Sequence, residues 1–523
     1  MYRNCYWCND RTQGGPCIKL ATWDSEGRRV RVNRQFMPYV YIENPHGEYK
    51  SIFGTKLEKR EFENPFDRKK YVDRVTTDRI FENFDATNQY LLDTYWETAE
   101  KEEFTKYELR TLFFDIEVDP IPGGEFPRPE EAKAEINIIT IYDYLTKKYH
   151  IFSKYNYNGN DLLPDSIFIP CKNERDLLQK FLLFWQGNDY PDIVAGWNSN
   201  GFDFPYVFNR IIRVLGDAAY YSLSPYGIVN TRETTDKMGR NVTVYDIAGV
   251  TLLDWLDVYT KFNAQKQESY KLDFIADKEL GYGKVDYKGM TIYEFMEKDW
   301  DKFVEYNVRD VELLVKLEEK LRYFSILRMI SNMACLNYNK GLTTIPVTNG
   351  AITLRARQRG LKVHTFKRKI DYSKKKPGAF VSSNAGLHHS IVTVDCGSMY
   401  PNITISNNIS PETKVGLVEF KIPSLSVYNG LPDDELTITM DNGKKYELTR
   451  DKLDFLIQQK NLVMSANGCL FTQDREGLFP QFMREVYSKR VAVRKEIKAL
   501  NMKNEKMENE IEELQKKLQY GQF

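Results

Sequence analysis

The stretch RTLFFDIEVDP at residues 110–120 carries two acids close together in an otherwise apolar run. Its composition predicts a β-strand, in which successive side chains point to opposite faces. Asp115 and Glu117 would then share one face, while Phe114 and Ile116 lie on the other. A strand with one solvated face would show the same alternation. Two carboxylates on one face could instead bind cations, provided that further acids converge on them.

Two later segments supply further acids. In AGWNSNGFDFPYVFNR, Asp203 follows a turn and precedes a predicted helix, whose first turn suits Pro205. In EYNVRDVELL, Tyr306 and Asp310 are four residues apart on a predicted helix and therefore lie on one face. Each acid also has an ordinary explanation: Asp203 as a helix N-cap, and Asp310 as a solvated acid beside a core tyrosine.

Convergence of these acids would have a chemical consequence. Four neighbouring carboxylates repel one another unless cations lie between them. Two divalent cations about 4 Å apart suit hydrolysis of a phosphodiester, because one generates the hydroxide nucleophile and the other stabilises the leaving oxygen. Tyr306, one helical turn before Asp310, could orient the attacking water.

The motifs F-D-I-E, N-x-x-x-F-D and Y-x-x-x-D, in this order, resemble the three exonuclease motifs of family B DNA polymerases. The resemblance implies that Asp115, Glu117, Asp203 and Asp310 hold the two Mg²⁺ ions of a 3′→5′ proofreading site, where Mn²⁺ can substitute. It also implies that Tyr306 orients the water in that site.

The segment VTVDCGSMYPNITISNNISPET is similar to polymerase motif A of the same family, and most closely to that of T-even-type bacteriophages. From the residues alone, we expect the strand IVTVD to end at Asp395, followed by a turn, which is also a common structural arrangement. The resemblance implies that Asp395 binds both catalytic Mg²⁺ ions and that Tyr400 excludes a 2′-hydroxyl. Ser398 and Met399 would contact the nucleotide, although the family usually has leucine at the position of Met399.

The segment KKKPGAFV resembles the linker between the exonuclease and palm domains of the family. The resemblance implies that DNA approaches the backbone closely at Gly378 and Ala379. Phosphate contacts that do not depend on sequence would come from Lys374, Lys375 and Lys376. A basic run of this kind is also typical of a solvated surface.

Near the C-terminus, Arg490 and Arg494 lie on one face of a predicted helix and match the fingers residues that grip the incoming triphosphate. The same helix carries a heptad-like stripe with one polar position. Its members are Val493, Ile497, Leu500, Asn504, Met507, Ile511, Leu514 and Leu518. Such a stripe needs a partner helix, and the fingers of the family are an antiparallel helix pair.

The family next requires a lysine-bearing helix ending N-S-x-Y-G (motif B) and a D-T-D-S hairpin (motif C), and neither occurs in the 523 residues. We therefore expect the N-terminal part of a phage replicative polymerase, either a naturally split enzyme or a truncated form. Its polymerase site would be completed by a C-terminal partner chain, through which a sliding clamp would also bind. The substrates implied are primer–template DNA, single-stranded DNA and deoxynucleoside triphosphates. The alternatives are a stand-alone exonuclease and a non-catalytic nucleic-acid-binding scaffold.

Composition sets broader limits. Lys plus Arg and Asp plus Glu both number 74, so net charge alone predicts neither a nucleic acid nor a membrane as partner. The seven cysteines lack framework spacing, which suits a reducing compartment without structural disulfides, and CYWC lacks the second half of a zinc site. Without a leader or a long apolar run, we expect a host-cytoplasmic protein that spans no membrane.

The order of predicted elements indicates an α+β multidomain chain. We expect an N-terminal α+β domain at 1–108 with a return segment at 322–366, and an RNase H-like α/β exonuclease domain at 109–321. The N-terminal half of the palm would span 367–476, and the first part of the fingers 477–523. Within the exonuclease domain, residues 231–245 predict a hairpin with its turn at Gly239, which matches the exonuclease hairpin of the family.

Overall fold

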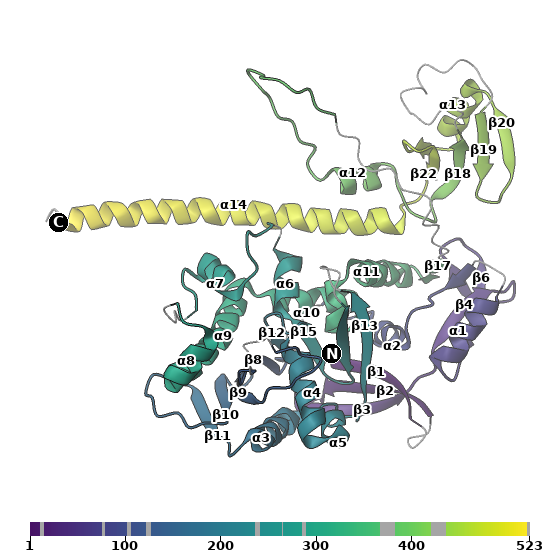
Figure 1. The fold of residues 1–523 in the computed structure, drawn as a ribbon. Helices are drawn as coiled ribbons and strands as arrows, with labels where there is room; N and C mark the ends of the chain where they lie inside the picture. Colours follow the sequence, from purple (N-terminus) through teal and green to yellow (C-terminus); the bar gives the residue numbers. More distant parts are fainter. Residues whose placement is uncertain are drawn as a thin grey trace. The chain divides into compact units, whose positions relative to one another are not determined.

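The computed structural model, shown in Figure 1, describes residues 1–10, 15–75, 79–101, 106–121, 127–235, 241–263, 265–284, 289–366, 382–419 and 436–519. Outside these ranges lie the turn at Gly239 and the expected DNA contacts Lys374, Lys375, Lys376, Gly378 and Ala379. The chain forms two compact units. Unit 1 comprises Met1–Tyr41, Lys59–Thr77 and Glu82–Gly350, and unit 2 comprises Ile42–Glu58, Asp78–Phe81 and Ala351–Phe523.

Helices and strands occur in both units, which confirms the predicted α+β multidomain class. The centre of unit 1 is a six-stranded sheet of order β11-β10-β9-β8-β12-β15. Strand β8 is antiparallel to β9 and parallel to β12, which is in turn parallel to β15. The strands are β8 (Thr111–Val118), β9 (Ile136–Asp143), β10 (Lys148–Ser153), β11 (Ser166–Pro170), β12 (Ile193–Gly196) and β15 (Thr251–Asp254).

Helices cover both faces of this sheet (Figure 1). Phe113 of β8 packs in a core with α6, α7 and α9, whereas Phe114 and Ile116 pack in a second core with α3 and α4. Strand β8 is therefore covered on both sides, and a solvated face does not explain its alternation. The helices are α3 (Glu174–Gln186), α4 (Asp203–Leu215), α5 (Asp217–Tyr221), α6 (Trp255–Phe262), α7 (Leu272–Leu280), α8 (Ile292–Lys298), α9 (Trp300–Leu321) and α10 (Tyr323–Met333).

An antiparallel three-stranded sheet, β1-β2-β3, begins unit 1. Arg3 of β1 is fully buried, and its Nη1 lies 2.8 Å from Oδ1 of Asp192, just before β12. The predicted hairpin is confirmed as the antiparallel pair β13 and β14, and Asn230 Nδ2 donates to Tyr6 Oη at 2.8 Å. These strands are β1 (Tyr2–Asp10), β2 (Gly15–Trp23), β3 (Arg29–Gln35), β13 (Val229–Thr235) and β14 (Asn241–Ile247).

Shorter elements complete both units. In unit 2, β16 is parallel to β5, β5 is antiparallel to β6, and β17 is antiparallel to β7. None of the helices in the described ranges has the length and apolar character needed to cross a membrane. The remaining elements are α1 (Pro65–Arg74), α2 (Ala86–Tyr95), α11 (Thr344–Gln358), β4 (Tyr39–Glu43), β5 (Tyr49–Ser51), β6 (Lys56–Glu61), β7 (Arg79–Phe81), β16 (Leu361–Lys362) and β17 (His364–Phe366).

The second half of unit 2 contains a five-stranded sheet of order β20-β19-β18-β22-β21. A small core joins this sheet to α13, centred on Val418, Ile438 and Leu453. Two further helices, α12 and α14, belong to the same unit. The elements are β18 (Lys414–Glu419), β19 (Leu436–Met440), β20 (Lys445–Leu448), β21 (Leu462–Met464), β22 (Cys469–Thr472), α12 (Met399–Ser406), α13 (Arg450–Gln459) and α14 (Leu478–Gln519).

The predicted strand IVTVD, which ends at Asp395, does not form. Residues 391–396 have neither helix nor strand structure, and Val394 is 86% exposed. A strand requires a neighbouring strand to pair its backbone N–H and C=O groups. Within the described ranges no strand pairs with this segment, so the alternating sequence is not sufficient to form a strand.

Candidate metal-binding site

Three of the predicted acids meet at the centre of unit 1. Asp115 and Glu117 extend from β8, and Asp310 extends from α9, which packs along that strand. One carboxylate oxygen from each residue lies within 4.8 Å of those of the other two. The packing of the helix on the strand therefore brings together acids that are almost two hundred positions apart in the sequence.

Helix α9 presents Tyr306 beside these acids. Its N-terminus is capped by Asp299, whose carboxylate accepts the backbone N–H of Lys302 at 3.2 Å. Tyr306 and Asp310 are one turn apart and are both buried. The Tyr306 ring packs against Phe303 and Phe295, so the hydroxyl is held by the apolar core behind it.

Asp203, the fourth predicted acid, is the first residue of α4 and is buried. It is not part of the group within 4.8 Å, but its charge raises the pKa of Asp115. The loop before it is held by Asp254, at the end of β15. This carboxylate accepts the backbone N–H of Asn198 at 2.9 Å and that of Asn200 at 3.1 Å. Asp254 is thus a positioning residue that we did not predict. The segment TLLD could have indicated it, because a short strand that ends in an acid just before a helix is the same pattern as at the other sites.

Two further polar residues in the site were also missed from the sequence. Lys284 Nζ lies 2.5 Å from Oδ2 of Asp310 and donates to the Tyr306 hydroxyl at 2.9 Å. Asn307 Nδ2 donates to Oδ2 of Asp115 at 2.6 Å. Lys284 lies in the segment between two helices, where no periodic sequence pattern indicates a functional residue. Asn307 could have been found from its place on α9 next to Tyr306.

Burial raises the pKa of all four predicted acids. It is the largest cause for Glu117, whose pKa rises to about 8, and for Asp203, whose pKa rises to about 7. Burial and then repulsion from neighbouring carboxylates raise the pKa of Asp115 well above its ordinary range. Burial disfavours the charged form of Lys284, yet attraction to Asp310 raises its pKa overall.

These residues fit a divalent cation. Buried carboxylates that repel one another are stabilised by positive charge placed between them, and oxygen ligands suit Mg²⁺ and Mn²⁺. Two buried oxygens, Asp310 Oδ1 and Asn307 Oδ1, accept no hydrogen bond from the described part of the chain. Asp310 Oδ1 is thus available as a ligand without the loss of an existing bond.

The residues expected at a polymerase site are placed differently. Asp395 lies in the exposed segment without regular structure, and Tyr400 of α12 is 75% exposed. Arg490 Nη1 of α14 donates to Ser398 Oγ at 3.3 Å, so one fingers residue and one motif A residue do meet. Met399 and Arg494 are exposed. No acidic group that could hold a metal includes Asp395 among the residues described.

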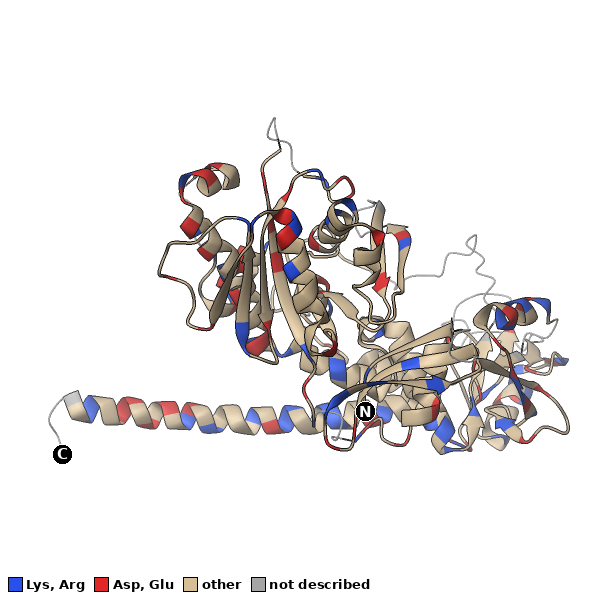
Figure 2. Cartoon of the chain, turned by 90° about the horizontal axis from the view of Figure 1, so that it is seen from below, with Lys and Arg blue, Asp and Glu red and all other residues tan. Residues whose placement is uncertain are grey.

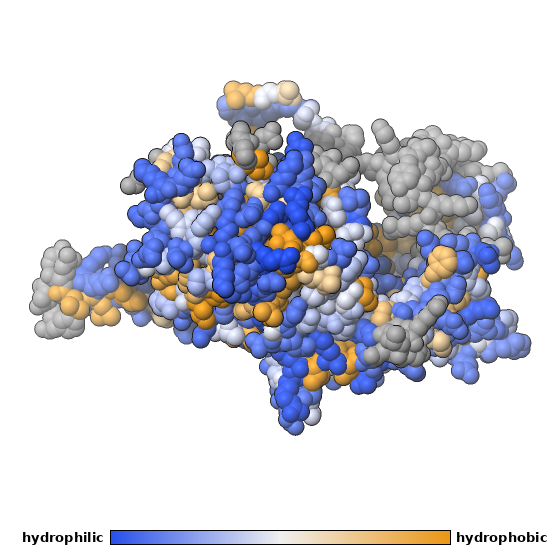
Figure 3. Space-filling view, turned by 60° about the horizontal axis from the view of Figure 1, so that its bottom comes forward, coloured by the Kyte–Doolittle hydropathy of each residue, from blue (hydrophilic) through white to orange (hydrophobic). Residues whose placement is uncertain are grey.

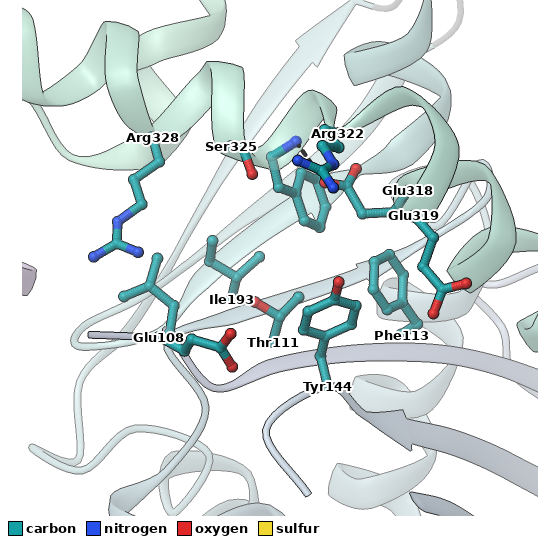
Figure 4. Close-up of a pocket in the computed structure, with 12 residues that line it drawn as sticks. Glu108, Thr111, Phe113, Tyr144, Ile193, Glu318, Glu319, Arg322, Ser325 and Arg328 are labelled. Atoms are coloured by element: carbon teal, nitrogen blue, oxygen red, sulfur yellow. Dashed lines mark hydrogen bonds between the residues drawn. The ribbon is translucent and has the colours of Figure 1, made fainter. Parts of the chain in front are cut away.

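A cavity of about 430 Å³ lies at the other end of the same two elements (Figure 4). Thr111 and Phe113 from the start of β8 line it, together with Glu318 from the last turns of α9 and Arg322 just beyond them. Burial raises the pKa of Glu318 to about 7, and its Oε1 accepts the backbone N–H of Phe324 at 3.0 Å. The acids and arginines around this cavity are mixed, so its charge indicates no single class of ligand.

Comparison with known proteins agrees with this geometry. Residues 71–275 match the model "DNA polymerase family B, exonuclease domain", which includes Asp115, Glu117 and Asp203. Residues 347–519 match the model "DNA polymerase family B", a range that includes Asp395 and all of α14.

Curated relatives cover most of the chain. The DNA-directed DNA polymerase of Escherichia phage RB69 is 28% identical over 500 residues, which are 89% of this chain and 51% of the relative. That of Enterobacteria phage T4 is 26% identical over 516 residues, 92% of this chain and 53% of the relative. DNA polymerase 1 of Sulfurisphaera ohwakuensis is 27% identical over 329 residues, 58% of this chain and 35% of the relative. The chain spans about half the length of the phage relatives, and it belongs to the family B DNA polymerases, including their exonuclease domain.

Proposed function

We propose that unit 1 is a 3′→5′ exonuclease that removes nucleotides from single-stranded DNA ends in a proofreading role. The observation that carries this proposal is the group of carboxylates from Asp115, Glu117 and Asp310, which lie within 4.8 Å of one another. Asp115 and Glu117 are half-buried, whereas Asp310 and the neighbouring Asp203 are buried. Such a group is costly to bury in a metal-free protein, because each acid raises the pKa of the others. A catalytic role explains why the fold retains it.

The four acids would hold two divalent cations, Mg²⁺ or Mn²⁺. When bound, these ions lower the pKa of a water molecule and stabilise the charge on the leaving 3′-oxygen. Asn307 fixes one oxygen of Asp115, so the carboxylate is oriented before the substrate binds. The loop held by Asp254 keeps Asp203 opposite β8.

Tyr306 would orient the attacking water. Its hydroxyl accepts a hydrogen bond from Lys284 and also hydrogen-bonds to the Asp310 side chain, so it is held beside the carboxylates where the water would bind. Burial raises the pKa of Asp310, and the charge on Lys284 opposes this rise, because a neighbouring cation favours the carboxylate. Hydrolysis then breaks the bond between phosphorus and the 3′-oxygen and releases a nucleoside 5′-monophosphate.

We infer for the second half a role in nucleotidyl transfer that depends on a separate C-terminal chain. Asp395 would bind both catalytic Mg²⁺ ions, Tyr400 would exclude the 2′-hydroxyl, and Arg490 and Arg494 would hold the triphosphate. The exposed segment around Asp395 supports this view, since no strand of the described ranges pairs with it and an added strand could do so. The partner would supply the second acid, the motif B helix and the path to a sliding clamp.

Two other functions remain as alternatives. A stand-alone exonuclease would use unit 1 alone and gain nothing from a partner chain. A non-catalytic nucleic-acid-binding scaffold would need no carboxylate group, and the intact acids argue against it.

A nuclease assay tests the proposal directly. Single-stranded DNA labelled at its 5′ end is incubated with the chain, with Mg²⁺ and then with EDTA. We expect stepwise shortening from the 3′ end with Mg²⁺ alone, and loss of at least 99% of it in the Asp310→Asn variant. The matched control is Asp277→Asn, an acid on α7 that lies outside the carboxylate group. Shortening that persists in Asp310→Asn or in EDTA would refute the assignment.

A further inference from the structure

A threonine interrupts the apolar strand next to the one that carries Asp115 and Glu117. Strand β9 is buried along its whole length, and from Ile136 to Ile141 most of its residues are isoleucine. A strand covered on both faces is usually apolar throughout. On the face of the molecule seen in Figure 3, hydrophilic residues predominate, and a threonine there would need no explanation. Thr140 lies inside the sheet and is 0% exposed, so its hydroxyl does need one.

The register of the sheet places Thr140 directly opposite Asp115. The two residues are Cα partners in the antiparallel pair of β8 and β9. Partners of this kind point to the same face, with Cβ atoms about 4.5–5.5 Å apart. The neighbouring pair identifies the face, because Phe113 and its partner Tyr142 both pack in the core with α9. The Thr140 hydroxyl therefore lies under α9, within reach of the Asp115 carboxylate.

The hydroxyl of Thr140 is buried and has no hydrogen-bond partner among the described residues. Such a group destabilises a fold, because it has lost its hydrogen bonds to water without a replacement. Valine is β-branched like threonine and suits a strand equally well. Folding alone would therefore favour valine at this position, and the threonine indicates a role in the site.

The Asp115 carboxylate can accept a further hydrogen bond. Asn307 Nδ2 donates to its Oδ2 at 2.6 Å, and no second donor contacts this carboxylate among the residues described. A carboxylate has about four acceptor positions on its two oxygens. The other buried acceptor nearby is Oδ1 of Asn307, which also lacks a donor from the described chain. An ionised carboxylate accepts more strongly than a neutral amide, so Asp115 is the favoured partner of the hydroxyl.

We propose that Thr140 is a positioning residue of the metal site, whose hydroxyl donates to the Asp115 carboxylate when a divalent cation binds. Asn307 and Thr140 then hold this carboxylate together, one from α9 and the other from β9. Hydrogen bonds of this type fix the orientation of a metal ligand, and loss of one typically lowers metal affinity by about tenfold to a hundredfold. The inference rests on the proposed function of unit 1 and adds a residue that contacts neither cation nor DNA.

Binding of Mn²⁺ to the full chain tests the proposal without any reaction. Acidic residues lie on elements throughout the chain, as Figure 2 shows, so weak binding elsewhere is measured first with Asp310→Asn and subtracted. Titration followed by electron paramagnetic resonance then gives the Kd of the site. We expect Thr140→Val to raise this Kd about tenfold or more, and Thr140→Ser, which keeps the hydroxyl, to stay within about threefold of the wild type. The matched control Thr111→Val replaces a buried threonine on the same face of β8 and should leave the Kd unchanged.

Thermal unfolding in EDTA separates this role from a structural one. Thr140→Val removes a buried hydroxyl that lacks a partner, so we expect its Tm to rise by about one to three degrees. Higher stability together with weaker Mn²⁺ binding supports the proposal. A lower Tm for Thr140→Val would show that the hydroxyl supports the fold itself, and would overturn it. Equal Mn²⁺ affinity in Thr140→Val and wild type, or failure of Thr140→Ser to restore affinity, would overturn it as well.

Degradation of single-stranded DNA separates failure of this inference from failure of the proposed function. A wild-type chain that binds Mn²⁺ but degrades no DNA contradicts the nuclease assignment and leaves the comparison of Kd values valid. In an active wild type, Thr140→Val should lower the rate at limiting Mg²⁺ and approach the wild-type rate at saturating Mg²⁺, because affinity is what is lost. An unchanged rate at limiting Mg²⁺ overturns the role of Thr140 alone. A wild type that binds no more Mn²⁺ than Asp310→Asn refutes both proposals.

Discussion

The two sites of this chain would use the same chemistry but differ in how their acids are held. Asp310 and Asp203 of the proposed exonuclease site are 3% and 4% exposed, and each is carried by a helix packed on one sheet. Asp395, which we expect at a polymerase site, lies in an exposed segment without regular structure. The difference shows that acids are brought together by packing several elements, and that a motif alone does not position its acid.

The largest expected effect concerns the less ordered site. The chain alone should give no detectable primer extension, because nucleotidyl transfer needs acids on both sides of the metal pair and only Asp395 is present. A second chain carrying the N-S-x-Y-G helix and the D-T-D-S hairpin should restore synthesis. Templated extension is measured with each chain separately and then with both. Robust extension by the 523-residue chain alone would contradict the split-enzyme hypothesis.

The ordered site should fail when its acids are removed. Asp115→Ala/Glu117→Ala should lower degradation of single-stranded DNA by about a thousandfold or more, because the metal ligands supply several kcal/mol of transition-state stabilisation. The fold should remain, since the substitution removes charge repulsion rather than apolar packing. Degradation rate and circular dichroism are compared with those of the control Glu130→Ala, an exposed acid elsewhere in unit 1. Unchanged degradation would rule out these two ligands.

A smaller effect is expected at the nucleotide contact. Tyr400→Ala, assayed together with the C-terminal chain, should raise incorporation of ribonucleotides relative to deoxyribonucleotides on the order of tenfold, because the ring would no longer exclude the 2′-hydroxyl. Tyr446→Ala, another exposed tyrosine of unit 2, serves as control. The ratio of the two kcat/KM values is the measurement, and an unchanged ratio would remove Tyr400 as the sugar gate.

The smallest effect concerns pH and stability without metal. Burial raises the pKa of Glu117 to about 8 and that of Asp203 to about 7, so the folded chain holds protons that the unfolded chain releases. In EDTA, the stability that these groups contribute should be complete below about pH 4, near their unfolded pKa, and should be lost as the pH rises to about 8. We expect a decrease in Tm of a few degrees between pH 5.5 and pH 8.

Two comparisons check that prediction. Glu117→Gln/Asp203→Asn should flatten the decrease, because neither side chain then titrates. Mg²⁺ should raise Tm more at pH 8 than at pH 5.5, since protons compete with it at the lower pH. An equal gain at both pH values would show that the buried acids do not bind the ion.

Periodicity predicted much of the candidate metal-binding site. Strand geometry alone places Asp115 and Glu117 on one face, and helix geometry alone places Tyr306 and Asp310 on one face. The packing of α9 on β8 then brings these two faces together. Lys284 lies between elements and has no such pattern. Its place beside Asp310 comes from the tertiary fold, so no local rule identifies it.

The failure at IVTVD has the opposite cause. The sequence alternates as a strand should, but a strand needs a neighbour, and the described chain provides none. The prediction of a strand at IVTVD is therefore wrong. Reading of the sequence pattern also predicted the stripe on α14, and here the predicted helix does form. A helix makes its hydrogen bonds within one segment and needs no neighbour, so it forms with its apolar side exposed.

The buried contacts of β1 bear on the timing of synthesis. The Tyr338 hydroxyl donates to the carbonyl of Tyr2 at 3.0 Å, although the two residues are 336 positions apart. Ribosomes add about 5 to 20 residues per second, so Tyr2 waits roughly 20 to 70 s for this contact. Arg3 waits a shorter time for Asp192. The first strand to leave the ribosome is thus among the last to be fully packed, although β2 and α2, which also contact it, are synthesised much earlier.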